Sequence, residues 1–567
     1  MQKKWSYQPL PNEKAISELS VVLNVSLPIA ALLLQRNITN FEEAKDYFRP
    51  NLDQLHNPFL MRDMDKAIWR IEEAIRNKER ILVYGDYDVD GTTSVALVYG
   101  FLRQFYSNLD YYTPDRNGEG YGVSEQGVKV AYDNKVDLII CLDCGIKSVA
   151  PVAYAKNLGI DFIICDHHRP GDELPDAFAV LDPKRNDCEY PYKELSGCGI
   201  GFKLLQALSI NNDLPIEKLY AFLDLVAVSI AADIVPINGE NRILAYYGLK
   251  KLNSEPRNGL KAIIESAGIK KPLDISSVVF GIAPRINASG RMTHAKQAIE
   301  LLLSDDYKRA EELATLANTV NEHRRDFDTS TTLEAFEMIE NEGLANAHST
   351  VLYKEDWHKG VIGIVASRCL DKYYRPTIIL TSANNKITGS ARSIQGFDIY
   401  EALSSCAEVL EQYGGHTHAA GLTLFYENLP KFKAMFEKIA TEQLSTELLI
   451  PPLRIDIALP LKVVNFKFLN VLKQMQPFGP ENMQPVFVSE NVFCDGYVKV
   501  LKEEHLKIYV RQEDSKPVEA IGFGLARYHK EIAEGKKFDI AYQIVENDFK
   551  GRVSLQLMLK DIKIRPF

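Results

Sequence analysis

Acidic and histidine side chains follow three short apolar runs of this chain. The three clusters are Asp86-Tyr-Asp88-Val-Asp90, Asp143-Cys-Gly145 and Asp166-His167-His168. Carboxylates gathered in one place repel one another, and divalent cations remove that repulsion. Carboxylate and imidazole ligands suit Mn²⁺ or Mg²⁺, and the histidines favour Mn²⁺. The residues therefore predict a site for two divalent metal ions, about 3.5–4 Å apart, that hydrolyses a phosphodiester.

The elements that must position these clusters are parallel strands. Apolar runs at residues 81–84, 136–142 and 160–165 alternate with helix-length segments such as 92–105. This alternation is typical of a parallel sheet with helices on both faces, a doubly wound α/β domain. Ligands bind beyond the carboxyl ends of such strands, so we expect the clusters to meet in one crevice. Asp86 and Asp88 are alternate residues of an extended segment and can face that crevice together.

Single acids also have an ordinary structural interpretation, because a lone aspartate more often caps a helix than binds a metal ion. Asp90 precedes Gly91-Thr-Thr and can lie near the cap of the helix that follows. Asp233 follows an apolar stretch and is, by itself, as consistent with a cap as with a ligand. The clusters at the strand ends carry the metal prediction, and Asp90 and Asp233 extend it.

Composition places the chain among globular proteins with several domains, at 567 residues, 46% hydrophobic and 25% charged. Eight cysteines in a chain of this length do not make a disulfide framework. We interpret Cys141 and Cys144, which have no second pair, as small residues flanking a strand end rather than a zinc or redox site. Asn24 and Pro28 interrupt the longest early apolar stretch, so we expect no membrane span, no signal peptide and a cytoplasmic protein.

Charge is distributed unevenly along the chain. The net charge of −10 argues against a general polyanion-binding surface. Residues 451–567 nevertheless carry 18 Lys and Arg against 15 Asp and Glu, so the acidic excess lies in residues 1–450. An acidic body suits a site that collects divalent cations, and the C-terminal segment is the expected place for a nucleic-acid strand.

The sequence pattern divides the chain into five parts. We predict an N-terminal helical region, residues 1–78, with helices at 15–23, 29–35, 41–48 and 64–77. The α/β domain with the clusters takes residues 79–292, and a connecting helix or helix pair takes 293–345. A smaller α/β domain follows at 346–449. After Pro451-Pro452, residues 451–567 contain strands with period-two alternation, which predicts a small β-barrel.

These motifs, taken in order, resemble those of the DHH phosphoesterase superfamily. The resemblance rests on the three clusters, Ala232-Asp233, Pro114-Asp-Arg116 with Gly120-Tyr-Gly122, Pro284-Arg-Ile-Asn-Ala-Ser-Gly-Arg291, and Trp357-His-Lys-Gly-Val-Ile-Gly-Ile-Val-Ala-Ser-Arg368. Residues 389–393 and 414–421 resemble the companion DHHA1 domain. Pro477-Phe-Gly479 and Pro485-Val-Phe487 resemble the opening of an OB-fold, although residues 480–483 replace a more glycine-rich turn. Within the superfamily the chain is similar, over nearly its whole length, to the bacterial single-stranded-DNA exonucleases.

The resemblance implies a role for each residue of the clusters. The implied metal ligands are Asp86, Asp88, Asp143, His167 and Asp233, with Asp90 as a further ligand unless it caps the helix. Asp143 would bridge the two ions. Asp166 would orient a histidine or the backbone, and His168 would face the scissile phosphate.

The smaller α/β domain carries a glycine pair beside a histidine. Gly414 and Gly415 let the backbone approach a ligand closely, and His416 can donate a hydrogen bond to a phosphate oxygen. A Gly-Gly pair is also common in ordinary turns. The resemblance favours the phosphate-binding interpretation and gives His416, like His168, a catalytic role in stabilising charge on the phosphate.

A second group in this domain suits a terminal phosphate. Ser390, Arg392 and Ser393 combine a guanidinium fork with hydroxyl donors. Arg116 and either Arg285 or Arg291 could join them, although a single arginine is as often part of a surface ion pair. The resemblance implies that these residues form a pocket for a 5′ phosphate, which would make the enzyme an exonuclease.

The C-terminal strands interleave aromatic and basic residues, namely Phe468, Phe478, Phe487, Phe493 and Tyr497 with Lys499, Lys502 and Lys507. Aromatic stacking combined with cations that follow the backbone binds single strands without sequence preference. We expect more than half of these aromatic side chains to lie in the barrel core instead.

Three functions follow from these observations. The first is a 5′-to-3′ exonuclease that releases mononucleotides from single-stranded DNA. For it the resemblance implies DNA repair and recombination, with single-strand-binding protein and a helicase as partners, and we expect a monomer. The second is a DHH enzyme for short oligoribonucleotides or cyclic dinucleotides, and the strands after residue 451 argue against it. The third is a scaffold without catalysis, and clustered carboxylates without metal would destabilise such a protein for no gain.

Overall fold

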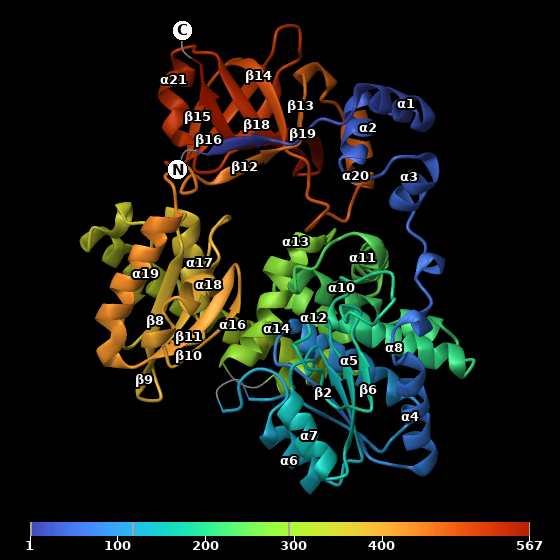
Figure 1. Ribbon diagram of the computed structural model, residues 1–567. Helices are drawn as coiled ribbons and strands as arrows, with labels where there is room; N and C mark the ends of the chain where they lie inside the picture. The colour runs from blue at the N-terminus through green and yellow to red at the C-terminus, as the bar shows by residue number, and fades with distance from the viewer. Residues whose placement is uncertain (1–2, 116–117, 293–294, 566–567) are drawn as a thin grey trace. The chain divides into compact units, whose positions relative to one another are not determined.

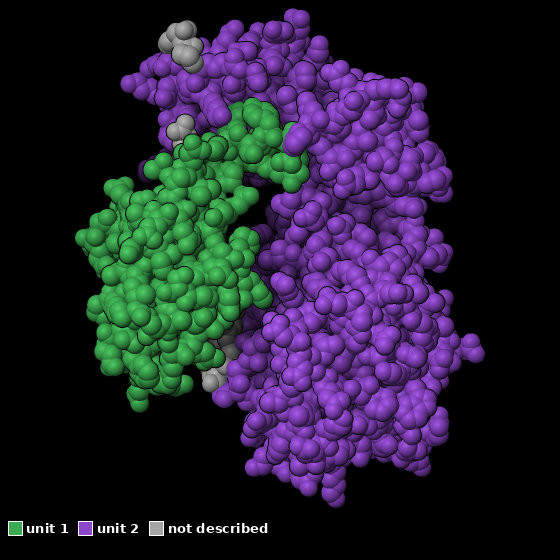
Figure 2. Space-filling model, in the orientation of Figure 1, with its two compact units in different colours: residues 1–8, 322–456 green, residues 9–321, 457–567 purple. Residues whose placement is uncertain are grey.

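The computed structural model describes residues 3–115, 118–292 and 295–565, except for the side chains of residues 289, 291 and 292. The chain divides into two compact units, residues 1–8 with 322–456 and residues 9–321 with 457–567, which Figure 2 colours separately. The larger unit contains the acidic and histidine clusters. The smaller unit contains Ser390, Arg392 and His416.

The sheet that carries the clusters has five parallel strands in the order β3-β2-β4-β5-β6. The strands are β3 (Leu109–Tyr112), β2 (Ile81–Gly85), β4 (Leu138–Leu142), β5 (Asp161–Cys165) and β6 (Ala179–Leu181). The apolar runs predict the three central strands, which are buried on both faces. The outer strands β3 and β6 are too short to give such a signal.

Alternate residues of each central strand enter two separate cores, which confirms the doubly wound fold. Ile81 and Val83 of β2 join the core formed with α4 (Met64–Asn77), α5 (Val89–Leu102) and α8 (Gly197–Asn211). Leu82 and Tyr84 join the opposite core with α6 (Glu125–Asp133) and α7 (Val149–Asn157). Helices thus cover both faces of the sheet (Figure 1), and only the strand ends remain open for a site.

Further helices complete this part of the chain and lead to the predicted connection. They are α9 (Glu217–Tyr220), α10 (Leu223–Ala232), α11 (Gly239–Ser254), α12 (Asn258–Ser266), α13 (Ile275–Ser277), a π-helical turn (Val278–Ile282), α14 (Ala283–Met292), α15 (Lys296–Leu303) and α16 (Tyr307–Asn341). The 35-residue α16 confirms the long connecting helix. It runs from the larger unit into the smaller one.

The C-terminal strands close into the expected barrel. Its sheet contains β13 (Ile457–Ala458), β14 (Phe487–Cys494), β18 (Phe538–Phe549), β19 (Arg552–Ile564), β17 (Val518–Gly522), β16 (His505–Arg511) and β15 (Lys499–Leu501), in that order. β14 pairs with β18 and also with β16, and this second pairing closes the ring. The helices α20 (Phe466–Gln474) and α21 (His529–Ala533) accompany the strands.

The N-terminal helices share the core of that barrel. They are α1 (Glu13–Leu23), α2 (Leu27–Leu34) and α3 (Phe41–Phe48), and Leu19, Leu32 and Ala44 pack in one cluster with barrel residues. Residues 1–78 are not wholly helical, because β1 (Lys4–Tyr7) pairs in parallel with β12 (Pro452–Ile455). No single helix in the described ranges is long and apolar enough to cross a membrane; only α1 and α2 together, bent by 110°, reach that length and composition.

The smaller unit has a mixed sheet in the order β10-β11-β9-β8-β7. Its strands are β7 (Thr350–Tyr353), β8 (Thr377–Ala383), β9 (Lys386–Arg392), β10 (Gln412–His416) and β11 (Ala419–Leu424), and its helices are α17 (Ile362–Tyr373), α18 (Ile399–Ser404) and α19 (Leu429–Gln443). Within this sheet β7 and β8 pair in parallel, and the other neighbouring strands pair antiparallel. This confirms the second α/β domain.

Candidate metal centre and phosphate pocket

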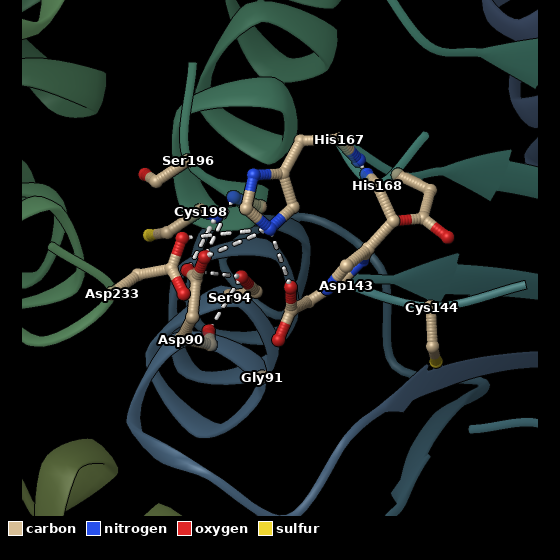
Figure 3. Close-up of polar contacts among 12 residues, drawn as sticks. Asp90, Gly91, Ser94, Asp143, Cys144, His167, His168, Ser196, Cys198 and Asp233 are labelled. Atoms are coloured by element: carbon tan, nitrogen blue, oxygen red, sulfur yellow. Dashed lines mark hydrogen bonds and ion pairs between the residues drawn. The ribbon is translucent and has the colours of Figure 1, made fainter. Parts of the chain in front are cut away.

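The imidazole of His167 lies at the centre of three carboxylates. Its Nε2 is 3.1 Å from Oδ1 of Asp143, 3.6 Å from Oδ2 of Asp233 and 3.7 Å from Oδ2 of Asp90 (Figure 3). Both ring nitrogens of His167 are buried without a hydrogen-bond partner among the described residues. Nitrogen and oxygen ligands at about 2.0–2.2 Å from one cation lie roughly 3 Å apart. The donor set and the orphaned nitrogens therefore fit a divalent metal ion.

The backbone on either side of the centre is held in unusual conformations. Asp143 follows β4 directly and has φ +59°. Asp233 caps the C-terminus of α10, and the next residue, Ile234, also has φ +59°. A β-branched residue rarely adopts the left-handed region, at a cost on the order of 1–3 kcal/mol. Such strain is concentrated at functional sites, because it aims particular side chains.

The N-terminus of α8 donates hydrogen bonds to one of these carboxylates, that of Asp90. Asp90 accepts hydrogen bonds from the backbone N–H groups of Gly197, at 2.7 Å, and Cys198, at 2.9 Å, and from the Ser229 hydroxyl at 2.7 Å. The helix dipole favours negative charge at this end. A Cβ atom on Gly197 would lie 2.6 Å from Cβ of Asp143, so glycine is required for the close approach.

Burial and mutual repulsion raise the pKa values of the clustered acids. Burial, reinforced by the charge of Asp88, raises the pKa of Asp86 to about 8. Burial and the charge of Asp90 raise the pKa of Asp233 to about 8, and the same two causes raise that of Asp143 well above its usual range. Without cations these carboxyls would hold protons at neutral pH, so bound cations are what allow them to ionise together.

Asp166 and His168 form an ion pair beside this centre. Burial alone would raise the pKa of Asp166. The hydrogen bond from His168, the positive charge of that histidine and a backbone N–H donor together lower this pKa to about 2. Burial likewise opposes the charge on His168, and the Asp166 hydrogen bond raises the pKa of the imidazole to about 9. Nδ1 of His168 lies 2.7 Å from Oδ1 of Asp166. His168 is therefore a fixed, positively charged donor at the strand ends.

The structure brings only some of the predicted metal ligands together. Among the described residues, two groups have donor atoms within 4.8 Å of one another: Asp143 with His167 and His168, and Asp90 with His167 and Asp233. Asp86 and Asp88 belong to neither group. The helix cap considered for Asp90 is made by Asp88, whose carboxylate accepts from the N–H of Gly91, 3.0 Å away.

Asp86 nevertheless stays close enough to act on the centre. One of its carboxylate oxygens accepts a hydrogen bond from the Gly122 N–H at 3.2 Å, and the other is buried without a hydrogen-bond partner among the described residues. The charges of Asp86 and Asp88 both contribute to the raised pKa of Asp143. Both acids therefore lie within electrostatic reach of the ligand groups.

Sequence reasoning missed a further acid, Asp182. It follows β6 and is fully buried, and burial, together with the charge of Asp166, raises its pKa to about 7. Asp182 thus repeats the arrangement of an acid after a buried strand. The signal was present in the sequence, but the three-residue strand Ala179–Leu181 is too short to stand out.

In the smaller unit, Arg392 is a largely buried guanidinium that pairs with no carboxylate in the described ranges. Its Nη1 donates to the Ser390 hydroxyl at 3.0 Å and to the Ala391 carbonyl at 2.7 Å, and burial lowers its pKa. A Cβ atom on Gly363, in the first turn of α17, would lie 3.0 Å from both the Arg392 guanidinium and the Ser390 hydroxyl. A cation, a hydroxyl and a helix N-terminus thus meet at one point, which suits a phosphate.

The glycine pair and its histidine lie in the same sheet. Arg392 is in register with Ala419 on β11, and Ala419 is in register with His416 on the exposed edge strand β10. Gly415 has φ +151°, and a Cβ atom there would lie 2.3 Å from the Ala419 carbonyl oxygen, so the edge of the sheet needs glycine.

Two of the remaining predicted phosphate residues, Ser393 and Arg285, hydrogen-bond to other groups of the protein. Ser393 donates to the Phe397 carbonyl at 2.7 Å. Arg285 lies in the larger unit and donates to Asn318 and to the Gly281 carbonyl, at 2.9 and 2.6 Å. Arg116 and the Arg291 side chain lie outside the described residues.

The parallel sheet with acids and histidines at its strand ends, joined by a long helix to a smaller mixed-sheet unit, defines a DHH-type phosphoesterase. Residues 80–230 match the DHH family, N-terminal domain; residues 346–442 match the DHHA1 domain; and residues 455–561 match the RecJ OB domain. The chain belongs to the RecJ family of single-stranded-DNA-specific exonucleases.

Relatives support this membership over nearly the whole chain. The single-stranded-DNA-specific exonuclease RecJ of Bacillus subtilis is 37% identical over 99% of this chain and 71% of its own length. The crystal structure of Thermus thermophilus RecJ with Mn²⁺ superposes with a TM-score of 0.85 at 27% identity, covering 100% of this chain and 80% of that one. The Mg²⁺ complex of the same protein gives 0.79 at 26% identity, covering 100% and 79%.

Proposed function

We propose that the protein is a metal-dependent exonuclease that degrades single-stranded DNA from the 5′ end and releases mononucleotides. The observation that carries this proposal is the buried His167 imidazole, whose Nε2 has no hydrogen-bond partner among the described residues and faces the carboxylates of Asp143, Asp233 and Asp90. A buried histidine without hydrogen bonds, surrounded by acids, has the chemistry of a metal ligand. The relatives are single-stranded-DNA-specific exonucleases by name, and one of them binds Mn²⁺ and Mg²⁺.

The proposed cofactor is a pair of divalent ions, Mn²⁺ or Mg²⁺. When bound, the two ions activate a water and stabilise the oxygens of the phosphodiester. The ligands we propose are Asp86, Asp88, Asp90, Asp143, His167 and Asp233. Asp166 holds His168 by its carboxylate and keeps the imidazole charged. His168 then donates to a non-bridging phosphate oxygen as negative charge develops there.

Selection of a strand end is assigned to the smaller unit. Arg392 is half-buried without a carboxylate partner among the described residues, and Ser390 and the first turn of α17 lie beside it. A terminal phosphate would satisfy these donors better than an internal phosphodiester, because it carries more charge and more acceptor oxygens. We assign His416 on β10 to a phosphate of the same strand. Preference for the 5′ end rests on the family resemblance.

The barrel supports a polymeric substrate. Phe468 and Phe487 are buried in its core, whereas the Tyr497 side chain is 58% exposed and Lys499 and Lys502 are exposed near it. These exposed side chains suit stacking and backbone contacts with a single strand. We further propose a cytoplasmic monomer acting in DNA repair and recombination, with single-strand-binding protein and a helicase as partners.

A phosphodiesterase for short oligoribonucleotides or cyclic dinucleotides is the second candidate. It would share the metal centre but would have no use for the domain at residues 455–561. The barrel therefore favours the exonuclease.

The test is digestion of single-stranded DNA labelled at the 5′ or the 3′ end, beside duplex DNA and RNA, with Mn²⁺, Mg²⁺ or EDTA. We expect the 5′ label to be released first as a mononucleotide, and no release in EDTA. Earlier release of the 3′ label would refute the polarity. Activity on short oligoribonucleotides or cyclic dinucleotides, with none on long single-stranded DNA, would favour the second candidate.

A further inference from the structure

The phenol of Tyr121 joins the strand ends that carry the metal centre. Its hydroxyl donates to the backbone carbonyl of Asp143 at 3.2 Å and lies 3.2 Å from Nε2 of His168. The two rings meet edge to face with centroids 5.9 Å apart. Tyr121 stands on the loop between β3 and α6, whereas its two partners follow β4 and β5. One side chain therefore contacts two residues of the site from a third element.

The loop that carries Tyr121 is itself fixed to β2. The Gly122 N–H donates to Asp86 at 3.2 Å, and the Tyr84 hydroxyl donates to the Gly122 carbonyl at 3.1 Å. The ring of Tyr121 also meets Tyr87 edge to face at 6.4 Å. Because Tyr84, Asp86 and Tyr87 all belong to β2 or the residues directly after it, the Tyr121 hydroxyl is held in place before any substrate arrives.

His168 needs two contacts to fix the plane of its ring. The bond between Nδ1 and Asp166 holds one edge of the imidazole and leaves rotation about that bond possible. The Tyr121 hydroxyl supplies the second contact, because it lies against the ring at 3.2 Å from Nε2 and 3.5 Å from Nδ1. The hydroxyl donates to the Asp143 carbonyl and lies beside both ring nitrogens, far from the direction of the Nε2–H bond. The Nε2–H of His168 therefore stays available to a phosphate oxygen.

We propose that Tyr121 is a positioning residue: its hydroxyl is anchored on the Asp143 carbonyl, and it orients His168 towards the scissile phosphate. The proposal rests on the function proposed above, in which His168 donates to a phosphate oxygen. A donor aimed before the reaction costs no reorganisation when charge develops, so loss of the aim lowers the rate rather than substrate binding.

The substitution that tests this role is Tyr121→Phe, which removes the hydroxyl and keeps the ring. We expect kcat on single-stranded DNA to fall roughly tenfold, as for loss of one hydrogen bond that positions a catalytic group. KM and the Mn²⁺ affinity measured by calorimetry should stay within about twofold, and Tm should not change. Tyr132→Phe is the matched control, because Tyr132 is exposed on α6 of the same domain, and it should match the wild type.

A crystal structure of metal-free Tyr121→Phe gives a readout without activity. We expect the His168 ring to rotate about its bond to Asp166, so that Nε2 leaves its place beside residue 121. The positioning role would be overturned if the His168 ring or kcat stayed unchanged. It would also be overturned if Tm, Mn²⁺ affinity and kcat all fell together, because that result indicates a general structural defect. A wild-type protein without nuclease activity would refute the proposed function instead, and the position of His168 would still decide whether Tyr121 orients it.

Discussion

Nε2 of His167 lies 3.1 Å from Oδ1 of Asp143, although neither ring nitrogen of the histidine has a hydrogen-bond partner among the described residues. A buried polar atom without a partner costs free energy, so such an arrangement persists only where a ligand repays it. Two more carboxylates, those of Asp90 and Asp233, lie within 3.7 Å of the same nitrogen. This geometry is the reason to assign the metal ions to His167 and its acidic neighbours.

The metal-free protein should lose stability as pH rises. The pKa values of Asp86 and Asp233 are raised to about 8 in the folded chain, whereas aspartates of an unfolded chain titrate near roughly 4. Between these values the folded state binds more protons, so the free energy of unfolding falls as pH increases. Thermal unfolding in EDTA should show a lower Tm at pH 8 than at pH 5.5.

Mn²⁺ should remove this pH dependence, because a bound cation holds the carboxylates ionised. Asp233→Asn is the control in EDTA, and it should flatten the decline, since an amide does not titrate. An EDTA-treated protein that is as stable at pH 8 as at pH 5.5 would contradict the raised pKa values.

Gly197→Ala should damage the metal centre without removing a ligand. The added methyl group would lie 2.6 Å from Cβ of Asp143, so either α8 or the Asp143 loop must move. We expect Mn²⁺ affinity to fall at least about tenfold by calorimetry, with a similar loss of kcat/KM. Gly199→Ala is a matched control in the same helix, because its methyl group would meet its nearest neighbours at an ordinary 3.4 Å. Equal effects of the two substitutions would argue against close contact between α8 and the centre.

Arg392→Gln should reduce discrimination between strand ends. Loss of a charged hydrogen bond to phosphate corresponds to about 1.5–3 kcal/mol, so KM for a 5′-phosphorylated strand should rise roughly 10- to 100-fold. KM for the same strand with a 5′-hydroxyl should change little, because it lacks the terminal phosphate. If both substrates lose affinity equally, Arg392 binds the strand elsewhere and the pocket is misassigned.

Contacts of the barrel with single-stranded DNA should appear in the salt dependence of the DNA-binding constant. Truncation before the barrel is a poor test, because Leu19 and Leu32 of the N-terminal helices pack in its core. Substitution of exposed lysines leaves this shared core intact, and the variant we choose combines Lys499→Ala with Lys502→Asn. Asparagine replaces Lys502 because this residue has φ +48°, a backbone region that asparagine tolerates. The slope of log K against log salt should become shallower by about 1.4 for two lost phosphate contacts. An unchanged slope would place the strand on another face.

The sequence predicts the strands, helices and most of the site because burial on both faces leaves long apolar runs. It fails where signals are short. Asp182 follows a strand of three residues, and β1 pairs with a strand more than 440 residues away, a contact that no local pattern reports. The sequence also allowed a helix cap at Asp90, whereas Asp88 caps α5, because helix boundaries read from a sequence are uncertain by about two residues and either aspartate can accept the N–H groups.

The most direct test of the metal centre is the rate of single-stranded DNA digestion by Asp143→Ala at saturating Mn²⁺. Asp133→Ala, an exposed acid at the end of α6, serves as the control and should keep the wild-type rate. Asp143 and His167 are proposed as ligands of the same metal ions. We therefore expect Asp143→Ala to lose activity by roughly a thousandfold or more while it still binds single-stranded DNA. Digestion by Asp143→Ala within about tenfold of the wild-type rate would contradict the assignment of catalysis to this centre.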